Sequence, residues 1–93
     1  GEEMSNCVQF GPVLTFNHEL IHDDKAQALK PLEEAAEIFG AWQEQDRRKT
    51  LDECADAIQA IANLCQALGQ YDMTPYMVRC RERNEARGRI YGV

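Results

Sequence analysis

The fold of this chain is decided by residues 32–68, LEEAAEIFGAWQEQDRRKTLDECADAIQAIANLCQAL. In the first third of this stretch, apolar residues recur every three or four positions, as on one face of a helix. They are Leu32, Ala35, Ala36, Phe39 and Trp42. A broader apolar stripe of the same period runs from Leu51 to Leu68. The spacing predicts two consecutive helices that are antiparallel neighbours, each with a face directed at a core.

The first of these helices has a recognisable start. Asp23 or Asp24 can cap it, and Gln27 stands three residues after Asp24, as in a capping box. Pro31 lies inside the pattern. Either a short helical turn precedes a helix that has Pro31 in its first turn, or one long helix kinks at this residue.

Local signals also bound the two helices that follow. The sequence Thr-Leu-Asp-Glu at 50–53 is a capping box, so the charged residues 46–49 are predicted to be a connection. Gly69 is predicted to end the second helix as the residue just beyond its cap. Thr74 and Pro75 have the order of an N-cap and a first helical residue, and start a third helix.

These signals predict an all-α fold, a helical bundle of about three main helices per chain. The helices are expected at 24–46, 50–68 and 75–87, behind an irregular N-terminal arm at 1–22. The 93 residues are expected to form a single domain, 1–93, close to the lower size limit for a self-sufficient core. We therefore expect oligomerisation to complete the bundle.

The charge of the chain is uneven. The net charge is −6, and residues 1–78 carry 14 acidic against 5 basic side chains, whereas residues 79–93 carry five arginines against two glutamates. An acidic body of this kind argues against binding to a nucleic acid duplex, which favours a basic face. The arginine-rich end is suited to a smaller anion.

The composition also bears on the compartment. Apolar runs are only a few residues long, far short of the ~20 that cross a bilayer, so no membrane contact is expected. The four cysteines stand far apart in the sequence, without the close pairs of a zinc knuckle or the density of a disulfide scaffold. Reduced thiols and a cytoplasmic location are the expectation.

Two acidic clusters are the candidate chemistry. Glu34 and Glu37 in the first helix, and Glu53 and Asp56 in the second, are each spaced i, i+3 and so share one helix face. Oxygen ligands of this kind suit Mg²⁺, with Mn²⁺ as an alternative, better than zinc. The simpler interpretation is that these acids cap the helices or stabilise helix dipoles. Glu53, however, lies on the apolar side of its helix, where an unpaired carboxylate is costly.

The surroundings of the first pair add one expectation. Glu34 and Glu37 lie off the apolar stripe of their helix, next to Ile38 and Ala41. An acidic face that only meets solvent does not need such neighbours. The pattern therefore predicts a helix that is contacted on two sides.

The arrangement Glu33-Glu34-x-x-Glu37, followed after 15 residues by Glu53-x-x-Asp56, resembles the signature of the MazG-like, all-α nucleoside triphosphate pyrophosphohydrolases. This resemblance covers roughly residues 25–91. It implies that four carboxylates hold Mg²⁺ and that Glu33 is an outer or activating carboxylate, with Glu33 or Glu37 accepting the proton of the attacking water. The four implied metal ligands are Glu34, Glu37, Glu53 and Asp56.

Basic residues are the candidates for the phosphates. Arg83, Asn84 and Arg87 are similar to the basic residue and asparagine that face the phosphates near the end of the last helix in the resembling family. Lys30, one turn before the first acidic cluster, is a further candidate. Trp42 either belongs to the core or stacks on the base of the substrate.

The resemblance implies a Mg²⁺-dependent hydrolase that cleaves a nucleoside triphosphate to the monophosphate and pyrophosphate. It also implies self-association, as a homodimer or a dimer of dimers. The competing hypothesis is a non-catalytic helical oligomer that binds a nucleotide or a protein partner. In that case the acids serve only as caps and surface charge.

Overall fold

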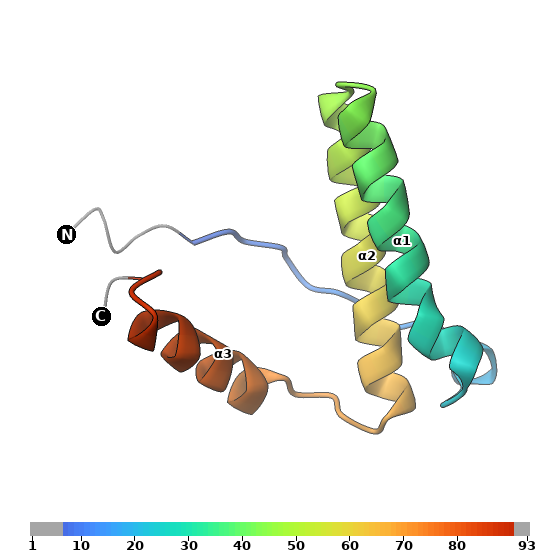
Figure 1. Ribbon diagram of the computed structural model, residues 1–93. Helices are drawn as coiled ribbons and strands as arrows, with labels where there is room; N and C mark the ends of the chain where they lie inside the picture. The colour runs from blue at the N-terminus through green and yellow to red at the C-terminus, as the bar shows by residue number, and fades with distance from the viewer. Residues whose placement is uncertain (1–6, 91–93) are drawn as a thin grey trace. The chain divides into compact units, whose positions relative to one another are not determined.

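The computed structural model describes residues 7–90. This part of the chain contains three α-helices, α1 (Lys25–Gln43), α2 (Arg47–Ala67) and α3 (Thr74–Ala86), and the short 3-10 helix η2 (His18–Leu20) (Figure 1). No strand occurs among the described residues, and the prediction of an all-α fold is confirmed. The arm before α1 is irregular apart from η2, as expected.

The chain divides into two compact units. One unit comprises Pro12–Gln70 and therefore holds the end of the arm, α1 and α2. The other holds α3, and its described residues are 7–11 and 71–90. The candidate carboxylates all lie in the first unit.

The start of α1 follows its sequence signals. Asp24 is the N-cap, and its Oδ1 accepts a hydrogen bond of 2.9 Å from the backbone N–H of Gln27. Gln27 in turn accepts a bond of 3.3 Å from the backbone of His22, which ties the arm to the helix start. Pro31 lies inside one continuous helix, which decides between the two alternatives left open by the sequence.

The predicted start of α2 is wrong. Asp46, not Thr50, is the N-cap, and its Oδ1 accepts a hydrogen bond of 3.0 Å from the backbone N–H of Lys49. The Thr50 hydroxyl instead donates to the carbonyl of Asp46, four residues earlier and 2.7 Å away. An earlier start is possible because Gln45 adopts a left-handed conformation, φ 59°, so the chain reverses within residues 44–46. The charged segment that was expected to be a connection is therefore the first turn of α2.

The other predicted boundaries are close to the observed ones. Gly69 follows the C-cap of α2 with φ 77°, and its N–H bonds to the carbonyl of Gln66, as expected for the residue beyond a helix end. The N-cap of α3 is Met73 rather than Thr74. The Asp72 carboxylate accepts a bond of 3.0 Å from the Thr74 N–H, and hydrogen bonding to the side chain of Thr74, followed by this backbone bond, lowers the pKa of Asp72.

Helices α1 and α2 pack against each other as an antiparallel pair, here called the helical hairpin (Figure 1). Its buried apolar residues are two small ones, Ala41 near the tip of the hairpin and Ala60 in the second half of α2. Because both are alanines, the helix backbones can approach closely there. The polar residues Glu34, Asn63 and Gln66 are buried as well.

The apolar stripe of α1 is not the face that meets α2, contrary to the sequence-based expectation of a core there. Leu32, Phe39 and Trp42 are 67%, 57% and 65% exposed, and the rings of Phe39 and Trp42 stack on each other at 6.0 Å. The contact with α2 is made instead through the second face, which carries Glu34 and Ala41. Both faces of α1 carry apolar residues, so periodicity alone could not decide between them.

The stripe of α2 is covered only in part, since Ile58 and Leu64 are half-buried whereas Leu51, Ile61 and Leu68 are exposed. Its uncovered part lies on the same side of the hairpin as the stripe of α1. Phe39 lies five positions after Glu34, and Cys65 lies five positions after Ala60, which is a rotation of about 140° on each helix. Because the two helices are antiparallel and both right-handed, turning by the same angle about each helix axis, away from the line of contact, leads to the same side of the hairpin. We call the exposed large residues of these stripes the apolar face. They are Leu32, Phe39, Trp42, Leu51, Ile61 and Leu68.

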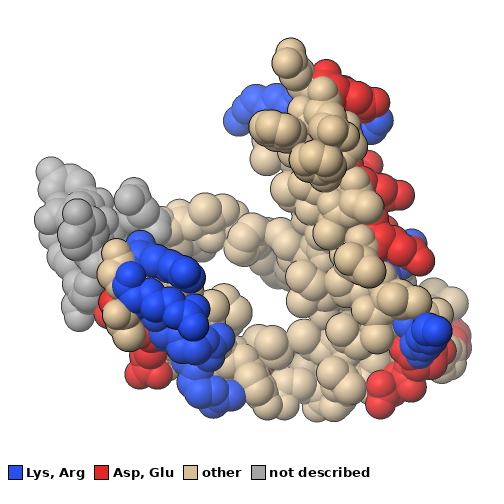
Figure 2. Space-filling view, viewed as in Figure 1, with Lys and Arg blue, Asp and Glu red and all other residues tan. Residues whose placement is uncertain are grey.

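The charged side chains have a different distribution. In the view of Figure 2 the acidic side chains of the helical hairpin lie along one edge, and most of its remaining visible surface is uncharged. Basic side chains gather along α3 in the same figure. The charge pattern of the hairpin therefore separates an acidic side from an apolar one.

Candidate metal centre

Three of the four predicted metal ligands converge. Glu34 and Glu37 of α1 and Glu53 of α2 each offer one carboxylate oxygen, and these three oxygens lie within 4.8 Å of one another. The i, i+3 spacing places the first two on one side of α1, and the antiparallel packing brings Glu53 against them. We call these three residues the carboxylate cluster.

Two members of the cluster contain buried oxygens without a partner. Glu34 is only 8% exposed, and its Oε2 has no hydrogen-bond partner among residues 7–90. The same holds for Oε2 of Glu53, which is half-buried. Two ionised carboxylates at this separation repel each other by on the order of 3 kcal/mol at an effective dielectric constant of about 20. A cation between them removes both this repulsion and the cost of the unpaired oxygens.

Lys30 neutralises only part of this charge. Its Nζ donates to Glu33 Oε2 at 3.4 Å and lies 3.5 Å from Oε1 of Glu34, so the two oxygens of Glu34 have different surroundings. The hydrogen bond to Glu33, followed by the charge of that residue, raises the pKa of Lys30 above its ordinary value of 10.5. Lys30 is thus a permanent cation in the neutral range, at the edge of the carboxylate cluster.

Capping does not explain the positions of these acids. Glu33 and Glu34 are the ninth and tenth residues of α1, and Glu53 is the seventh residue of α2. All three lie beyond the first turn, where the helix dipole and the free N–H groups act. The earlier start of α2 therefore removes the capping-box interpretation of Glu53.

Asp56, the fourth predicted ligand, is exposed and is not a member of the carboxylate cluster. It shares with Glu34 and Lys30 the lining of a cavity of about 370 Å³ on the acidic side of the hairpin. Glu33 is exposed and bound to Lys30. The structure thus brings three of the predicted ligands together and places Asp56 beside them, at the cavity.

The sequence analysis missed the residues that form the rest of this cavity. Gln59 and Asn63 of α2 line it, together with Phe16, Leu20 and His22 of the arm. Gln59 Nε2 donates to the carbonyl of Leu14 at 2.8 Å, and Asn63 Oδ1 accepts from the Phe16 N–H at 3.2 Å. Asn63, a polar residue between the apolar pairs Ile61-Ala62 and Leu64-Cys65, is the signal that could have indicated a contact at this position.

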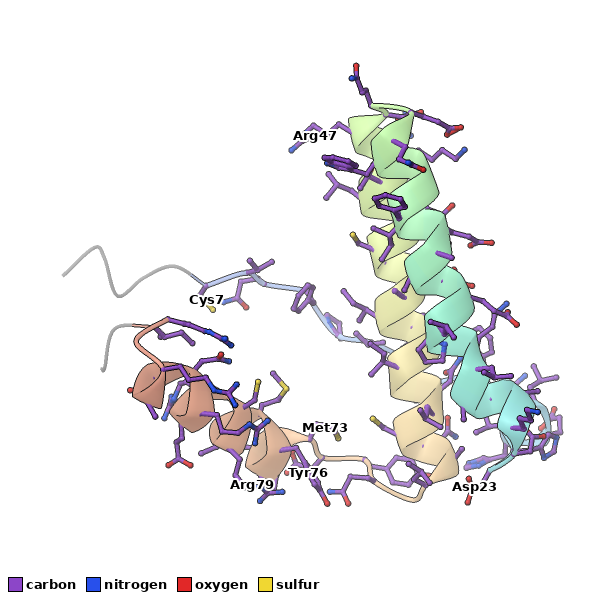
Figure 3. All side chains as sticks on the ribbon, in the orientation of Figure 1. Cys7, Asp23, Arg47, Met73, Tyr76 and Arg79 are labelled. Carbon is purple, nitrogen blue, oxygen red and sulfur yellow. The ribbon has the colours of Figure 1, made fainter. Side chains whose placement is uncertain are left out.

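The predicted phosphate-binding residues of α3 lie in the other compact unit. The Asn84 side chain donates to the carbonyl of Cys80 at 3.1 Å and accepts from Arg89 at 3.3 Å, so local contacts hold it. Arg83 and Arg87 form no ion pair within the described part of the chain. Figure 3 shows Arg79 and Tyr76 on α3, where the guanidinium lies 4.6 Å from the ring centre. A phosphate contact of these residues remains a prediction.

Trp42 also remains a candidate only. It is exposed and lines a second depression, of about 460 Å³, at the tip of the hairpin, together with Arg47 and Leu51. Figure 3 labels Arg47 at this end of the hairpin. Trp42 is therefore not a core residue of the single chain, and its contact with a base stays a prediction.

Comparison with protein-family models, curated proteins and solved structures gave no match. The resemblance to the MazG-like enzymes thus stays a prediction that rests on the spacing of the carboxylates. Among the described residues, no helix combines the length and the apolar character needed to cross a membrane.

Proposed function

We propose that this chain is a Mg²⁺-dependent nucleotide pyrophosphohydrolase, which cleaves a nucleoside triphosphate to the monophosphate and pyrophosphate. The observation that carries the proposal is the carboxylate cluster, in which two neighbouring helices direct three acids to one point and leave two buried oxygens unpaired. A structural role for these acids would leave an unfavourable charge in place. A bound cation removes it.

The donor set fits a hard divalent ion. Each member of the cluster offers a carboxylate oxygen, which suits Mg²⁺ or Mn²⁺. Such an ion, when bound, supplies charge neutralisation of the triphosphate and makes a water molecule more acidic. Asp56 stands at the adjacent cavity, where it can complete the ligand set when substrate is present.

The remaining roles fall to residues near the cluster. Lys30 stays charged and is placed to contact a phosphate oxygen next to Glu34. Either Glu33 or Glu37 accepts the proton of the attacking water. Arg83, Asn84 and Arg87 are proposed to contact the phosphates further from the cleaved bond.

The active form is proposed to be a homodimer or a dimer of dimers that pairs through the apolar face. The buried apolar residues of the single chain are two alanines, whereas six large apolar side chains of the hairpin are exposed on one side. On α2 the stripe repeats at intervals of three and four residues, as in helices that pack in bundles. A second copy presents the same uncharged stripes, so two hairpins can form one four-helix core.

Release of pyrophosphate tests the proposed activity. The full chain is incubated with Mg²⁺ and a panel of ribo- and deoxynucleoside triphosphates, including modified bases, and pyrophosphate is assayed. We expect release from at least one nucleotide, and none after removal of the metal with a chelator. Absence of release across the panel would contradict the proposal.

A non-catalytic helical oligomer that binds a nucleotide or a protein partner is the competing function. The exposed apolar face is compatible with it, because an adaptor also needs a docking surface. The carboxylate cluster favours the enzyme. Stabilisation by Mg²⁺ together with hydrolysis supports the first function, whereas neither effect is expected of an adaptor.

A further inference from the structure

The cavity beside the carboxylate cluster has the lining of a nucleoside site. It measures about 370 Å³, within the range of about 300–1,000 Å³ that is typical of small-molecule sites. Its walls come from the arm and from both helices of the hairpin, all within the compact unit Pro12–Gln70. Glu34 belongs to both the cavity and the cluster, so the two are continuous.

The lining changes in character along the cavity. Lys30, Glu34 and Asp56 supply the charged groups that a metal and phosphates require. Asn63 lies seven residues beyond Asp56, which is about 10 Å further along α2, and the rest of the lining is made of amides, apolar side chains, His22 and Asp24. A nucleotide has the same polarity, since a charged phosphate chain is followed by a flat base with polar edges.

Hydrogen bonds fix the two amides at the far end. Asn63, only 4% exposed, accepts through Oδ1 from the Phe16 N–H at 3.2 Å and from Gln59 Nε2 at 3.0 Å. Gln59 Nε2 also donates to the carbonyl of Leu14. Within residues 7–90, the other amide atoms, Asn63 Nδ2 and Gln59 Oε1, have no hydrogen-bond partner. One donor and one acceptor are thus held in place at the cavity and can be used by a ligand.

Phe16 supplies the apolar surface. Its ring is half-exposed, and its backbone is held by the bond to Asn63, so the arm presents an aromatic side chain at the cavity at a defined position. Aromatic rings stack on any nucleobase, because every base has a π-face. An aromatic surface beside a fixed donor and acceptor matches a base better than it matches an aliphatic or purely anionic ligand.

We infer that the cavity between the N-terminal arm and the hairpin binds the nucleoside of the substrate, with the base against Phe16 and its edge hydrogen-bonded to Gln59 and Asn63. This inference rests on the proposed function for the identity of the ligand. It also assigns a role to the arm, as one wall of the binding site. It places the base at this cavity and not at Trp42.

Hydrolysis kinetics provide the first test. We expect Phe16→Leu and Gln59→Ala to raise KM about tenfold for the preferred nucleotide with a smaller change in kcat, because they remove contacts to the base and not to the phosphates. Leu14→Ala is the matched control, since this exposed arm residue is outside the cavity lining, and its KM should stay within twofold. Unchanged KM for both cavity variants in an active enzyme overturns the inference and leaves the proposed function intact.

Binding provides a test that does not depend on turnover. Nucleoside monophosphates with the four common bases are titrated into the full chain with Mg²⁺, and the side-chain amide and indole resonances are followed by NMR. We expect shifts of the Gln59 and Asn63 amides with at least one base, which are lost in Phe16→Leu. Shifts restricted to the Trp42 indole, or no shift with any base, overturn the inference. Amide shifts without pyrophosphate release uphold the cavity and contradict the proposed hydrolysis.

Discussion

Glu34 of α1 and Glu53 of α2 bring one carboxylate oxygen each to within 4.8 Å of the other, and each keeps an oxygen buried without a hydrogen-bond partner among the described residues. The two residues belong to different helices, so their approach depends on how the helices pack. Such a pair is unfavourable when both groups are ionised and no cation is present.

The first prediction concerns stability in the presence of metal. Mg²⁺ should raise the melting temperature, because an ion that binds only the folded state stabilises it by about 2.7 kcal/mol at a concentration of 100 times its Kd. Glu53→Gln should lose most of this response to Mg²⁺. In the presence of a chelator it should have a higher melting temperature than the wild type, because one of the mutually repelling charges is gone. Differential scanning fluorimetry over a Mg²⁺ titration measures both effects. Asp52→Asn, one position away and exposed, is the control and should respond like the wild type.

The second prediction concerns catalysis. Glu37→Gln should lower kcat by a factor of about a hundred or more, because it removes one ligand oxygen without changing the size of the side chain. Asp56→Asn should also reduce activity. Glu44→Gln, at the C-cap of the same helix, is the matched control, since Glu44 lies outside the carboxylate cluster and pairs with Lys49. Wild-type rates in both Glu37→Gln and Asp56→Asn, measured with helicity checked by circular dichroism, would refute the metal assignment.

The third prediction concerns self-association. Ile61→Glu should dissociate the oligomer, because it places a charge in the middle of the apolar face. Much of the helicity should be lost with it, because two alanines are the buried apolar residues of the hairpin alone. Analytical ultracentrifugation and circular dichroism at matched concentrations measure this. Leu14→Glu introduces the same charge at an exposed arm position and should leave the mass unchanged; a wild-type protein that is monomeric at all concentrations contradicts the proposed pairing.

The fourth prediction concerns pH. The Glu33 contact raises the folded-state pKa of Lys30, so its contribution to stability is fully present below 10.5 and is lost as the pH rises through the higher folded value. The free energies of unfolding of the wild type and of Lys30→Met should therefore differ by a constant amount from pH 7 to about 9. Above that pH the difference should shrink. Urea unfolding across this range measures it. A difference that disappears already near neutral pH would show that Lys30 is not held as a cation.

The start of α2 shows where local signals were sufficient and where they were not. The first helix was expected to be capped by Asp23 or Asp24, and Asp24 is the cap; the glycine at position 69 was also assigned correctly, since a cap depends on a few neighbouring residues. Asp46 and Thr50 are both residue types that cap helices, and only Thr50 has a glutamate three residues later, so the local pattern favoured Thr50 over the true cap, Asp46. Asp46→Ala should cost about 1 kcal/mol of stability, more than Thr50→Ala.

The periodicity and spacing of the sequence predicted two helices with a short connection, at 24–46 and 50–68, and a pair of carboxylates on one face of each helix. They did not determine which face of α1 meets α2, because the helix has apolar residues on both. The tertiary structure decided this. The small side chains of Ala41 and Ala60 allow close packing, and that packing brings Glu34, Glu37 and Glu53 together while Asp56 lines the cavity beside them. The rotation and register of two packed helices depend on every contact between them, and no local stretch of sequence specifies these.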